Sequence, residues 1–347
     1  MFKKLDINYF KCFEKLSLDW KKLNIISGEN STGKSTVIQA ILLLAQAQEY
    51  TSGNVLNGKY EQMGQIIDIK NIYKRGRINI NAEYDNGNEK QFVLEYDDIN
   101  EKWKISIPDK MDIIYLSAER IGVQNEYHIN TQELYRIGVR GEYAFDFLSK
   151  NKHENLREEK FAIREAGLNL GNQVDYWLNY IAGYTVQAEA IDGTTIVKVA
   201  YREKDSVKDL RPCHVGTGVS YLAGVIIAAL SCTRDSLFIV ENPEIHLHPG
   251  AQSRFVEFFA FLASKGLQVI METHSDHIIN GVRKAIKRNN ISSQETAIYF
   301  MKKNEENISE AVSMRISEKG VIINQEKGFF DQFDNDLDVL LGFDEYE

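Results

Sequence analysis

The stretch Gly28-Glu29-Asn30-Ser31-Thr32-Gly33-Lys34-Ser35-Thr36 decides the fold of this chain. It matches the pattern G-x-x-x-x-G-K-[ST] at every fixed position. The short apolar run 23–27 leads into it, and residues 37–48 follow it with apolar side chains on one helical face. A strand, a glycine-rich loop and a helix in this order are the context that a phosphate-binding loop requires. A glycine loop that arose by chance would lack this context, so we predict a nucleotide-binding loop here.

The residue types of this loop suit the phosphates of ATP. Successive backbone N–H groups can curl round phosphate oxygens, and the helix that follows presents its positive end to them. We expect Lys34 to reach the β- and γ-phosphates and the Ser35 hydroxyl to bind Mg²⁺. The predicted ATP-binding residues of the loop are Gly28, Asn30, Ser31, Thr32, Gly33, Lys34, Ser35 and Thr36.

The bulk properties are those of an ordinary globular protein. The chain has 347 residues, of which 43% are hydrophobic and 26% charged, and its net charge is −9. This charge argues against a surface that binds nucleic acid everywhere but allows a local basic patch. The three scattered cysteines have no metal-ligand spacing and fit a reducing compartment. We find no signal peptide, and the most apolar stretch, 219–232, is too short to span a bilayer, so we predict a cytoplasmic protein without membrane contact.

Strand and helix patterns alternate outward from the loop. Two alternating runs, 78–84 and 91–96, flank Asp85-Asn86-Gly87-Asn88 and predict a hairpin, with a third strand at 103–107. Residues 112–116 then return to a buried central strand. A more polar helical segment covers 131–184, and a second hairpin, 186–201, turns at Asp192-Gly193. Strands at 236–240 and 267–271 alternate with helices from residues 219, 252 and 278, a pattern typical of an α/β sheet with helices on both faces.

Three more segments place polar residues where a nucleotide site needs them. The buried strand at 237–240 ends in Glu241-Asn242-Pro243-Glu244, and an acid at such an end suits a Mg²⁺-water site. The strand at 267–271 runs into Glu272-Thr273-His274, where His274 could contact a γ-phosphate or position water. Residues 215–220 place glycines before a helix, which makes a second anion-binding helix start. Each of the last two also occurs as an ordinary loop or helix start, so we draw no role from either by itself.

Taken in order, these motifs resemble the ATP-binding-cassette (ABC) class of ATPases, in the branch with SMC-like heads, RecF and the ATPase domains of OLD-family nucleases. The resemblance rests on segments 9–13, 28–36, 115–120, 241–249 and 272–276. The ending Gly328-Phe329-Phe330-Asp331-Gln332-Phe333 is similar to small prokaryotic ATPases found with anti-phage defence operons, such as the Septu ATPase.

The resemblance implies an α/β P-loop NTPase of the ABC and SMC-head type, with a mixed central sheet. One ABC-type ATPase domain would cover residues 1–347, with an antiparallel β subdomain at about 76–108 and a helical insertion at about 131–184. It also implies a homodimer or higher oligomer that forms on ATP, because a signature loop caps the γ-phosphate bound by the other subunit. Gly216, Thr217, Gly218 and Ser220 stand where that loop would be.

Several site roles carry over, with departures from the usual pattern. Glu241 takes the place of the Mg²⁺-binding acid and His274 that of the switch histidine. The usual catalytic glutamate position holds Asn242, which leaves Glu244 as the nearest base. Where a glutamine normally touches Mg²⁺ and water, the chain has Ser117-Ala118-Glu119, so we assign Glu119 to the metal site. These departures predict slow hydrolysis.

The leading hypothesis is an ATPase that controls a separate effector, a nuclease, in anti-phage defence. Because the chain ends at Glu347, soon after the strand that leads to His274, we expect the nuclease to be another protein. An alternative is a RecF-like repair ATPase that binds DNA directly, for which Arg283, Lys284, Lys287 and Arg288 form a basic helix end. A third is a nucleotide sensor that does not hydrolyse ATP, as Asn242 would allow.

Overall fold

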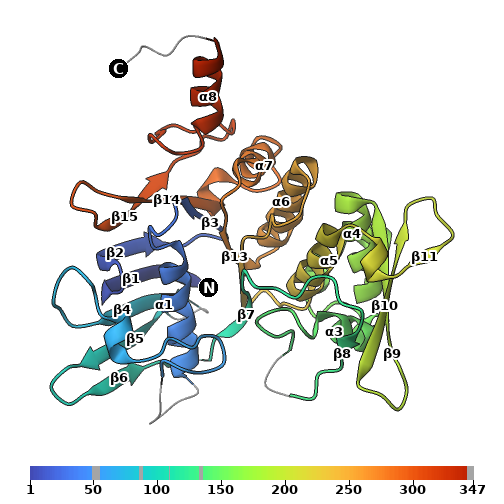
Figure 1. Cartoon of the computed structure of the whole chain (residues 1–347), viewed down its shortest axis with the longest axis horizontal. Coiled ribbons are helices and arrows are strands. Elements are labelled where there is room, and N and C mark those ends of the chain that lie inside the picture. The colour runs from blue at the N-terminus through green and yellow to red at the C-terminus, as the bar shows by residue number, and fades with distance from the viewer. Residues whose placement is uncertain (49–54, 86–88, 109, 133–135, 342–347) are drawn as a thin grey trace.

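A six-stranded sheet forms the centre of the molecule. The computed structural model describes residues 1–48, 55–85, 89–108, 110–132 and 136–341 (Figure 1). Five strands of the central sheet are parallel and the sixth, at one edge, is antiparallel. In spatial order they are β15 (Ser309–Met314), β14 (Thr296–Lys303), β3 (Leu23–Gly28), β13 (Gln268–Glu272), β12 (Ser236–Glu241) and β7 (Asp112–Leu116).

The central strands are apolar throughout because both faces of the sheet are covered. In β12, Leu237 and Ile239 belong to one hydrophobic core, whereas Phe238 and Val240 belong to the core on the opposite face. Strands buried on both faces read as continuous apolar runs rather than alternating ones. The expected return of the chain to the central sheet at 112–116 is confirmed by the pairing of β7 with β12.

A five-stranded antiparallel sheet covers one face, with helix α1 (Lys34–Ala47) packed between the two sheets. Its order is β2 (Phe13–Asp19), β1 (Phe2–Phe10), β4 (Asn79–Asp85), β5 (Glu89–Asp97) and β6 (Lys102–Ser106). The predicted hairpin and its third strand are confirmed. The predicted turn residues Asn86-Gly87-Asn88 lie outside the described residues. The short helix α2 (Ile66–Ile69) follows on this side.

Helices and a small sheet form the lobe on the right of Figure 1 and cover the other face. Its helices are α3 (Ala144–Asn151), α4 (Leu170–Ala182) and α5 (Thr217–Leu230), with 3-10 turns at Glu159–Phe161, Arg164–Ala166 and Pro212–His214. Its strands are β8 (Tyr127–His128), β9 (Tyr184–Ala190), β10 (Ile196–Glu203) and β11 (Asp209–Leu210). The segment expected to be helical, 131–184, holds α3 and α4, and the hairpin expected at 186–201 is β9 and β10.

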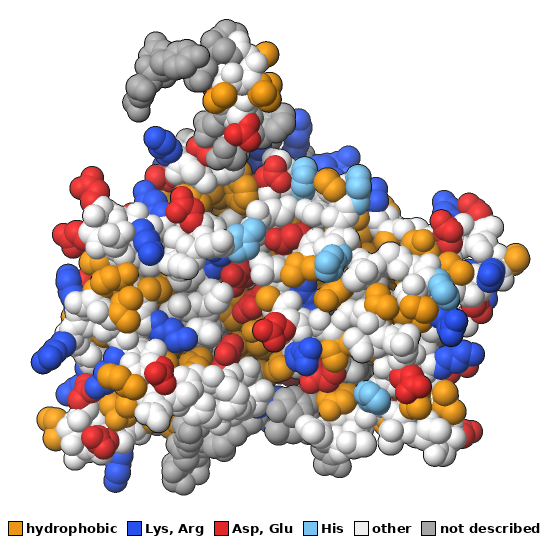
Figure 2. All heavy atoms as spheres, in the orientation of Figure 1, with side chains coloured by type: hydrophobic (Ala, Val, Ile, Leu, Met, Phe, Trp, Pro, Cys, Tyr) orange, Lys and Arg blue, Asp and Glu red, His pale blue; other side chains and the backbone are white. Residues whose placement is uncertain are grey.

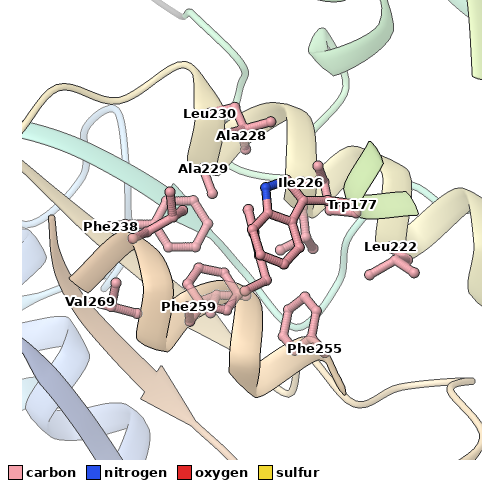
Figure 3. Packing of buried hydrophobic residues seen from close by; sticks show 14 of the residues in the cluster. Trp177, Leu222, Ile226, Ala228, Ala229, Leu230, Phe238, Phe255, Phe259 and Val269 are labelled. Carbon is pink, nitrogen blue, oxygen red and sulfur yellow. The ribbon is translucent and has the colours of Figure 1, made fainter. Parts of the chain in front are cut away.

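Aromatic packing ties this lobe to the central sheet (Figure 3). Trp177 of α4 packs against Phe258 of helix α6 (Pro249–Ser264), with ring centroids 5.0 Å apart. On the same helix Phe259 stacks on Phe238 of β12 at 5.3 Å and meets Phe255 at 4.9 Å. Such contacts combine large buried area with favourable ring geometry, so α6 fixes α4 relative to β12.

The remaining elements lie at one edge. Helix α7 (Asp276–Lys287) packs on α6, a 3-10 turn at Ser293–Glu295 leads into β14, and α8 (Gln332–Leu341) projects from the body of the molecule (Figure 1). The apolar stretch 219–232 lies in and just after α5 and is buried almost throughout. Within the described ranges, no helix combines the length and the hydropathy needed to cross a bilayer.

Candidate nucleotide site

The loop between β3 and α1 has backbone conformations that its glycines permit. Gly28 and Gly33 have φ values of 140° and 99°, in a region that other residues rarely adopt. A Cβ on Gly28 would lie 2.1 Å from the carbonyl oxygen of Met301, and one on Gly33 would lie 2.5 Å from the ring of Phe13. Both glycines are therefore required by space as well as by conformation. Ser31, between them, also has a positive φ of 61°.

The start of α1 offers a cradle of N–H groups. Helix α1 has no side-chain cap, and the N–H groups of Gly33, Lys34, Ser35 and Thr36 have no acceptor among the residues that the structure describes. Such groups at a helix N-terminus attract anions because the helix dipole adds to their partial positive charge. The loop thus fits a chain of phosphates.

The Lys34 side chain is hydrogen-bonded to the backbone of the phosphate loop. Its Nζ donates to the carbonyl oxygens of Gly28, at 2.9 Å, and Glu29, at 2.5 Å. The side chain is 5% exposed, and burial lowers its pKa, which nearby Glu272 and Glu29 partly oppose. A phosphate could replace these carbonyl oxygens as the acceptor, with a charge that carbonyls lack.

Two carboxylates meet beside the loop because β12 and β13 are parallel and in register. Glu241 and Glu272 are directly paired at the ends of these strands, and both are buried. The Ser35 hydroxyl donates to both carboxylate oxygens of Glu272, at 3.1 and 3.2 Å. Glu241 accepts from the Tyr115 hydroxyl at 3.0 Å and from the Ala118 N–H at 3.1 Å.

Burial dominates the electrostatics of this pair. It raises the pKa of Glu272 to about 7, helped by the charge of Glu241 and opposed by Lys34 and Ser35. Burial also raises the pKa of Glu241, against the hydrogen bonds from Ala118 and Tyr115. A third acid, Glu61, is half-buried nearby, and burial and then Glu241 raise its pKa. The site thus holds more negative charge than its own cations neutralise.

The donor set fits Mg²⁺. Mg²⁺ sites commonly use one or two carboxylates together with waters and substrate phosphates rather than a cage of protein ligands. Among described residues, no group of three or more His, Cys, Asp or Glu side chains could hold a metal by itself. The Ser35 hydroxyl and the carboxylates of Glu241 and Glu272 are the oxygens in position for such an ion.

Glu272 lies at the site although no role was predicted for it, whereas Glu119, which was predicted as a metal ligand, is exposed. The sequence predicted no role for Glu272, although its strand ends in an acid just as the strand of Glu241 does. Glu119 has an exposed side chain that forms no hydrogen bond or ion pair within the described part of the chain; only its carbonyl accepts, from Arg140 at 3.0 Å. The neighbouring Ala118 N–H contacts Glu241 instead.

The turn after β12 places Glu244 against His274. The His274 N–H donates to Glu244 Oε1 at 2.8 Å, while Glu244 Oε2 is buried with no partner among the described residues. Burial and then the charge of Lys34 lower the pKa of His274. Asn242, at the usual base position, has φ 43° and donates its N–H to the Glu272 carbonyl at 2.8 Å. Glu244 therefore has one carboxylate oxygen bound to the His274 N–H and a second, buried oxygen without a partner among the described residues.

The second glycine-rich segment forms the start of α5, as predicted, but not every residue of it is accessible. Gly216 and Thr217 are exposed, and α5 has no side-chain cap. Gly218 is buried, and a Cβ there would lie 2.3 Å from the His246 carbonyl oxygen. Ser220 is 1% exposed and its hydroxyl is buried, because α5 is covered on nearly all sides after its first turn. This burial does not favour nucleotide binding by Ser220, which stays a prediction. On the face of the molecule that Figure 2 shows, acidic side chains and histidines gather over the middle.

Comparisons with known proteins agree with this geometry. Residues 23–280 match the family described as "AAA domain, putative AbiEii toxin, Type IV TA system". Residues 291–340 match a family described as a protein of unknown function (DUF3696). The OLD nuclease of Thermus scotoductus (strain ATCC 700910 / SA-01) is 22% identical over 317 residues, which are 79% of this chain and 59% of that protein. This chain thus spans less than two thirds of that relative's length.

The fold is that of SMC heads. The SMC head domain from Thermotoga maritima has a TM-score of 0.53 at 13% identity, covering 91% of this chain and 99% of that chain. The Smc head domain with an extended coiled coil, bound to the C-terminal domain of ScpA from Pyrococcus furiosus, has a TM-score of 0.52 at 12% identity and covers 99% of both chains. These likenesses confirm the predicted fold class. The chain belongs to the AAA-domain family that matches residues 23–280, and it has the fold of SMC heads.

Proposed function

We propose that this protein binds ATP with Mg²⁺, hydrolyses it, and forms an ATP-bound homodimer that controls a separate effector, a nuclease, in prokaryotic anti-phage defence. The observation that carries the enzymatic part is the contact of the phosphate-loop serine, Ser35, with the buried acid pair at the ends of β12 and β13. A hydroxyl, two carboxylates and a row of free N–H groups at one sheet edge suit a Mg²⁺-triphosphate.

In this proposal the phosphate loop binds the triphosphate, and Ser35, Glu241 and Glu272 would hold the metal. Bound Mg²⁺ would neutralise part of the negative charge of the triphosphate. Lys34 adds a positive charge on the other side of the phosphates. Burial raises the pKa values of Glu241 and Glu272, and a bound divalent cation would favour their charged forms.

Glu244 is the proposed base for hydrolysis. Its Oε1 accepts a hydrogen bond from the His274 N–H. Its Oε2 is buried and has no partner among the described residues, and in this proposal it takes a proton from a water molecule. The Asn242 amide cannot accept a proton near neutral pH, so it can only orient water. His274, whose pKa is lowered, would be a neutral hydrogen-bonding group beside the γ-phosphate.

The exposed start of α5 supports a dimer. Gly216 and Thr217 form an uncapped helix N-terminus, which is a good anion site, yet no described contact joins them to the phosphate loop of the same chain. A second copy related by a two-fold axis would place each α5 start on the other copy's γ-phosphate.

Two observations favour control of an effector over direct DNA binding. One relative is an OLD nuclease, which associates this kind of ATPase with nuclease activity. Three of the four basic residues at the end of α7 already have partners: Lys284 and Arg288 contact Glu257 at 2.8 and 3.3 Å, and Arg283 donates to the Gly320 carbonyl. Those charges are therefore poorly available to DNA phosphates. We place this activity in the cytoplasm.

Replacing Lys34 by alanine should weaken Mg²⁺-ATP binding at least about tenfold, because charge-assisted hydrogen bonds to phosphate are lost. Isothermal titration calorimetry measures the change. Lys287→Ala, at an exposed lysine of α7, should bind ATP as the wild type does. Equal ATP affinity in Lys34→Ala and wild type would contradict the proposed site.

Replacing Glu244 by glutamine should lower the ATP turnover number by about a hundredfold or more while ATP still binds, because a general base contributes on the order of 10² to 10⁴ in rate. Asn242→Ala should reduce turnover far less. Phosphate release under saturating ATP measures both. If Asn242→Ala stops hydrolysis and Glu244→Gln does not, the base is assigned wrongly; if wild type binds ATP without turnover, the protein is a nucleotide sensor.

Glu272 should make the metal-free protein less stable at high pH. Its folded pKa of about 7 lies above the value of about 4.3 for a free glutamate, so its relative stabilisation is present below that lower value and is lost as pH rises through 7. Glu272→Gln should therefore exceed wild type in stability at pH 8, by on the order of 1–3 kcal/mol, and approach it near pH 5. Urea unfolding with EDTA and without nucleotide measures this, with Glu119→Gln as the exposed control. A stability difference independent of pH would disprove the raised pKa.

Replacing Thr217 by glutamate should block ATP-driven dimerisation, because a carboxylate at the start of α5 repels a γ-phosphate. An acid at a helix N-terminus does not destabilise the helix itself. Analytical ultracentrifugation with ATP and Mg²⁺ compares Thr217→Glu with Thr195→Glu, an exposed threonine of the β9–β10 hairpin. Mixing Thr217→Glu with Lys34→Ala should restore one intact site per heterodimer, so at most half the turnover. A wild type that hydrolyses ATP at full rate as a strict monomer would exclude the shared site.

A further inference from the structure

Arg120 is a buried arginine with no role in the chemistry described so far. It is 6% exposed and follows β7. Its Nη1 donates to the carbonyls of Ser117, at 2.9 Å, and Glu241, and its Nη2 donates to the Asn242 carbonyl at 2.8 Å. No carboxylate forms an ion pair with it in the described part of the chain. Burial lowers the pKa of Arg120 to about 10, which the charges of Glu244 and Glu241 partly oppose. A buried charge whose hydrogen bonds go only to carbonyls is costly, and the gain is a fixed planar geometry.

The bonds of Arg120 hold a bent segment, the turn 242–248. Two residues of this turn that are not glycine, Asn242 and His246, have positive φ values of 43° and 62°. Such conformations persist where the surroundings determine them. Arg120 fixes the first carbonyl of the turn, that of Asn242, and Gln252 Nε2 fixes one near its end by donating to the Leu247 carbonyl at 2.8 Å.

The other face of Arg120 meets α5. Its guanidinium lies 6.0 Å from the ring centroid of Tyr221, which is in the second turn of α5. The Tyr221 ring lies 5.3 Å from the ring of His246, in the turn. Gly218, in the first turn of α5, packs directly on the His246 carbonyl. The start of α5 and the turn after Glu241 therefore form one packed unit around Arg120.

We propose that Arg120 is a positioning residue that ties the turn 242–248 to α5 through Tyr221. A change at the acids and Glu244 when ATP binds would move the turn, and the turn would carry the exposed start of α5 with it. Each copy would then present α5 to its partner's ATP only when its own site is filled. This inference rests on the proposed ATP-driven dimer and adds the residue that couples the two surfaces.

The sharpest test uses Tyr221→Leu, which removes the ring between Arg120 and His246 without touching the carbonyls that Arg120 holds. Tyr176→Leu, on α4 and 39% exposed, is the matched control. We expect Tyr221→Leu to bind ATP within about twofold of wild type and to dimerise about tenfold more weakly with ATP, a coupling of ordinary size. Its urea midpoint should stay close to that of the control. Calorimetry and ultracentrifugation supply the two binding readouts.

Arg120→Lys, alone and combined with Tyr221→Leu, completes a double-mutant cycle. Lysine keeps the charge but cannot span the carbonyls, so it should also weaken dimerisation, and the double variant should be no weaker than the stronger single effect. Independent, additive effects would overturn the link. So would variants that dimerise as well as wild type, or that lose ATP affinity and dimerisation equally. If the wild type stays monomeric with ATP, the proposed dimer is wrong, and the coupling inferred from it is wrong as well.

Discussion

The register of β12 and β13 brings two buried carboxylates, Glu241 and Glu272, side by side, and the site is organised around that contact. Like charges in a poorly hydrated place repel, and burial raises the pKa of both groups. Each neighbouring group offsets part of this cost. Ser35 donates to Glu272, Tyr115 and the Ala118 N–H donate to Glu241, and Lys34 lies close enough to oppose the shift.

The same pairing explains why the site lies where separate stretches of the chain meet. Parallel strands carry their carboxyl ends to one edge of a sheet, where loops from distant parts of the sequence converge. The phosphate loop follows β3, the acids end β12 and β13, and Arg120 follows β7. Burial of the strands on both faces holds these ends rigidly, as catalytic geometry requires.

Local sequence patterns predicted the parts of this site that depend on short segments. The phosphate loop needs glycines at two fixed positions, and the close approach of Met301 to Gly28 gives the reason for one of them. Contacts between distant segments could not be predicted in this way.

The place of Glu272 in the site depends on its register with Glu241, and that of Arg120 on hydrogen bonds to carbonyls about 120 positions away. The burial of Ser220 follows from the packing of α5 on all sides, which a glycine-rich helix start does not reveal. Likewise, β1 and β2 join the hairpin sheet through pairing that spans some seventy residues.

The excess of negative charge also bears on the amide of Asn242, at the position where the resemblance to ABC ATPases leads one to expect a glutamate. Glu61, Glu241 and Glu272 already crowd this edge of the sheet, and the pKa of each is raised. A carboxylate at position 242 would add a further like charge directly after Glu241. Asparagine avoids that charge, and it tolerates the left-handed backbone, φ 43°, better than glutamate does. The one carboxylate that the turn retains is Glu244, two residues on, where the His274 N–H stabilises its charge. The amide at position 242 thus adds no like charge beside Glu241, while the carboxylate of the turn lies where a backbone N–H donates to it.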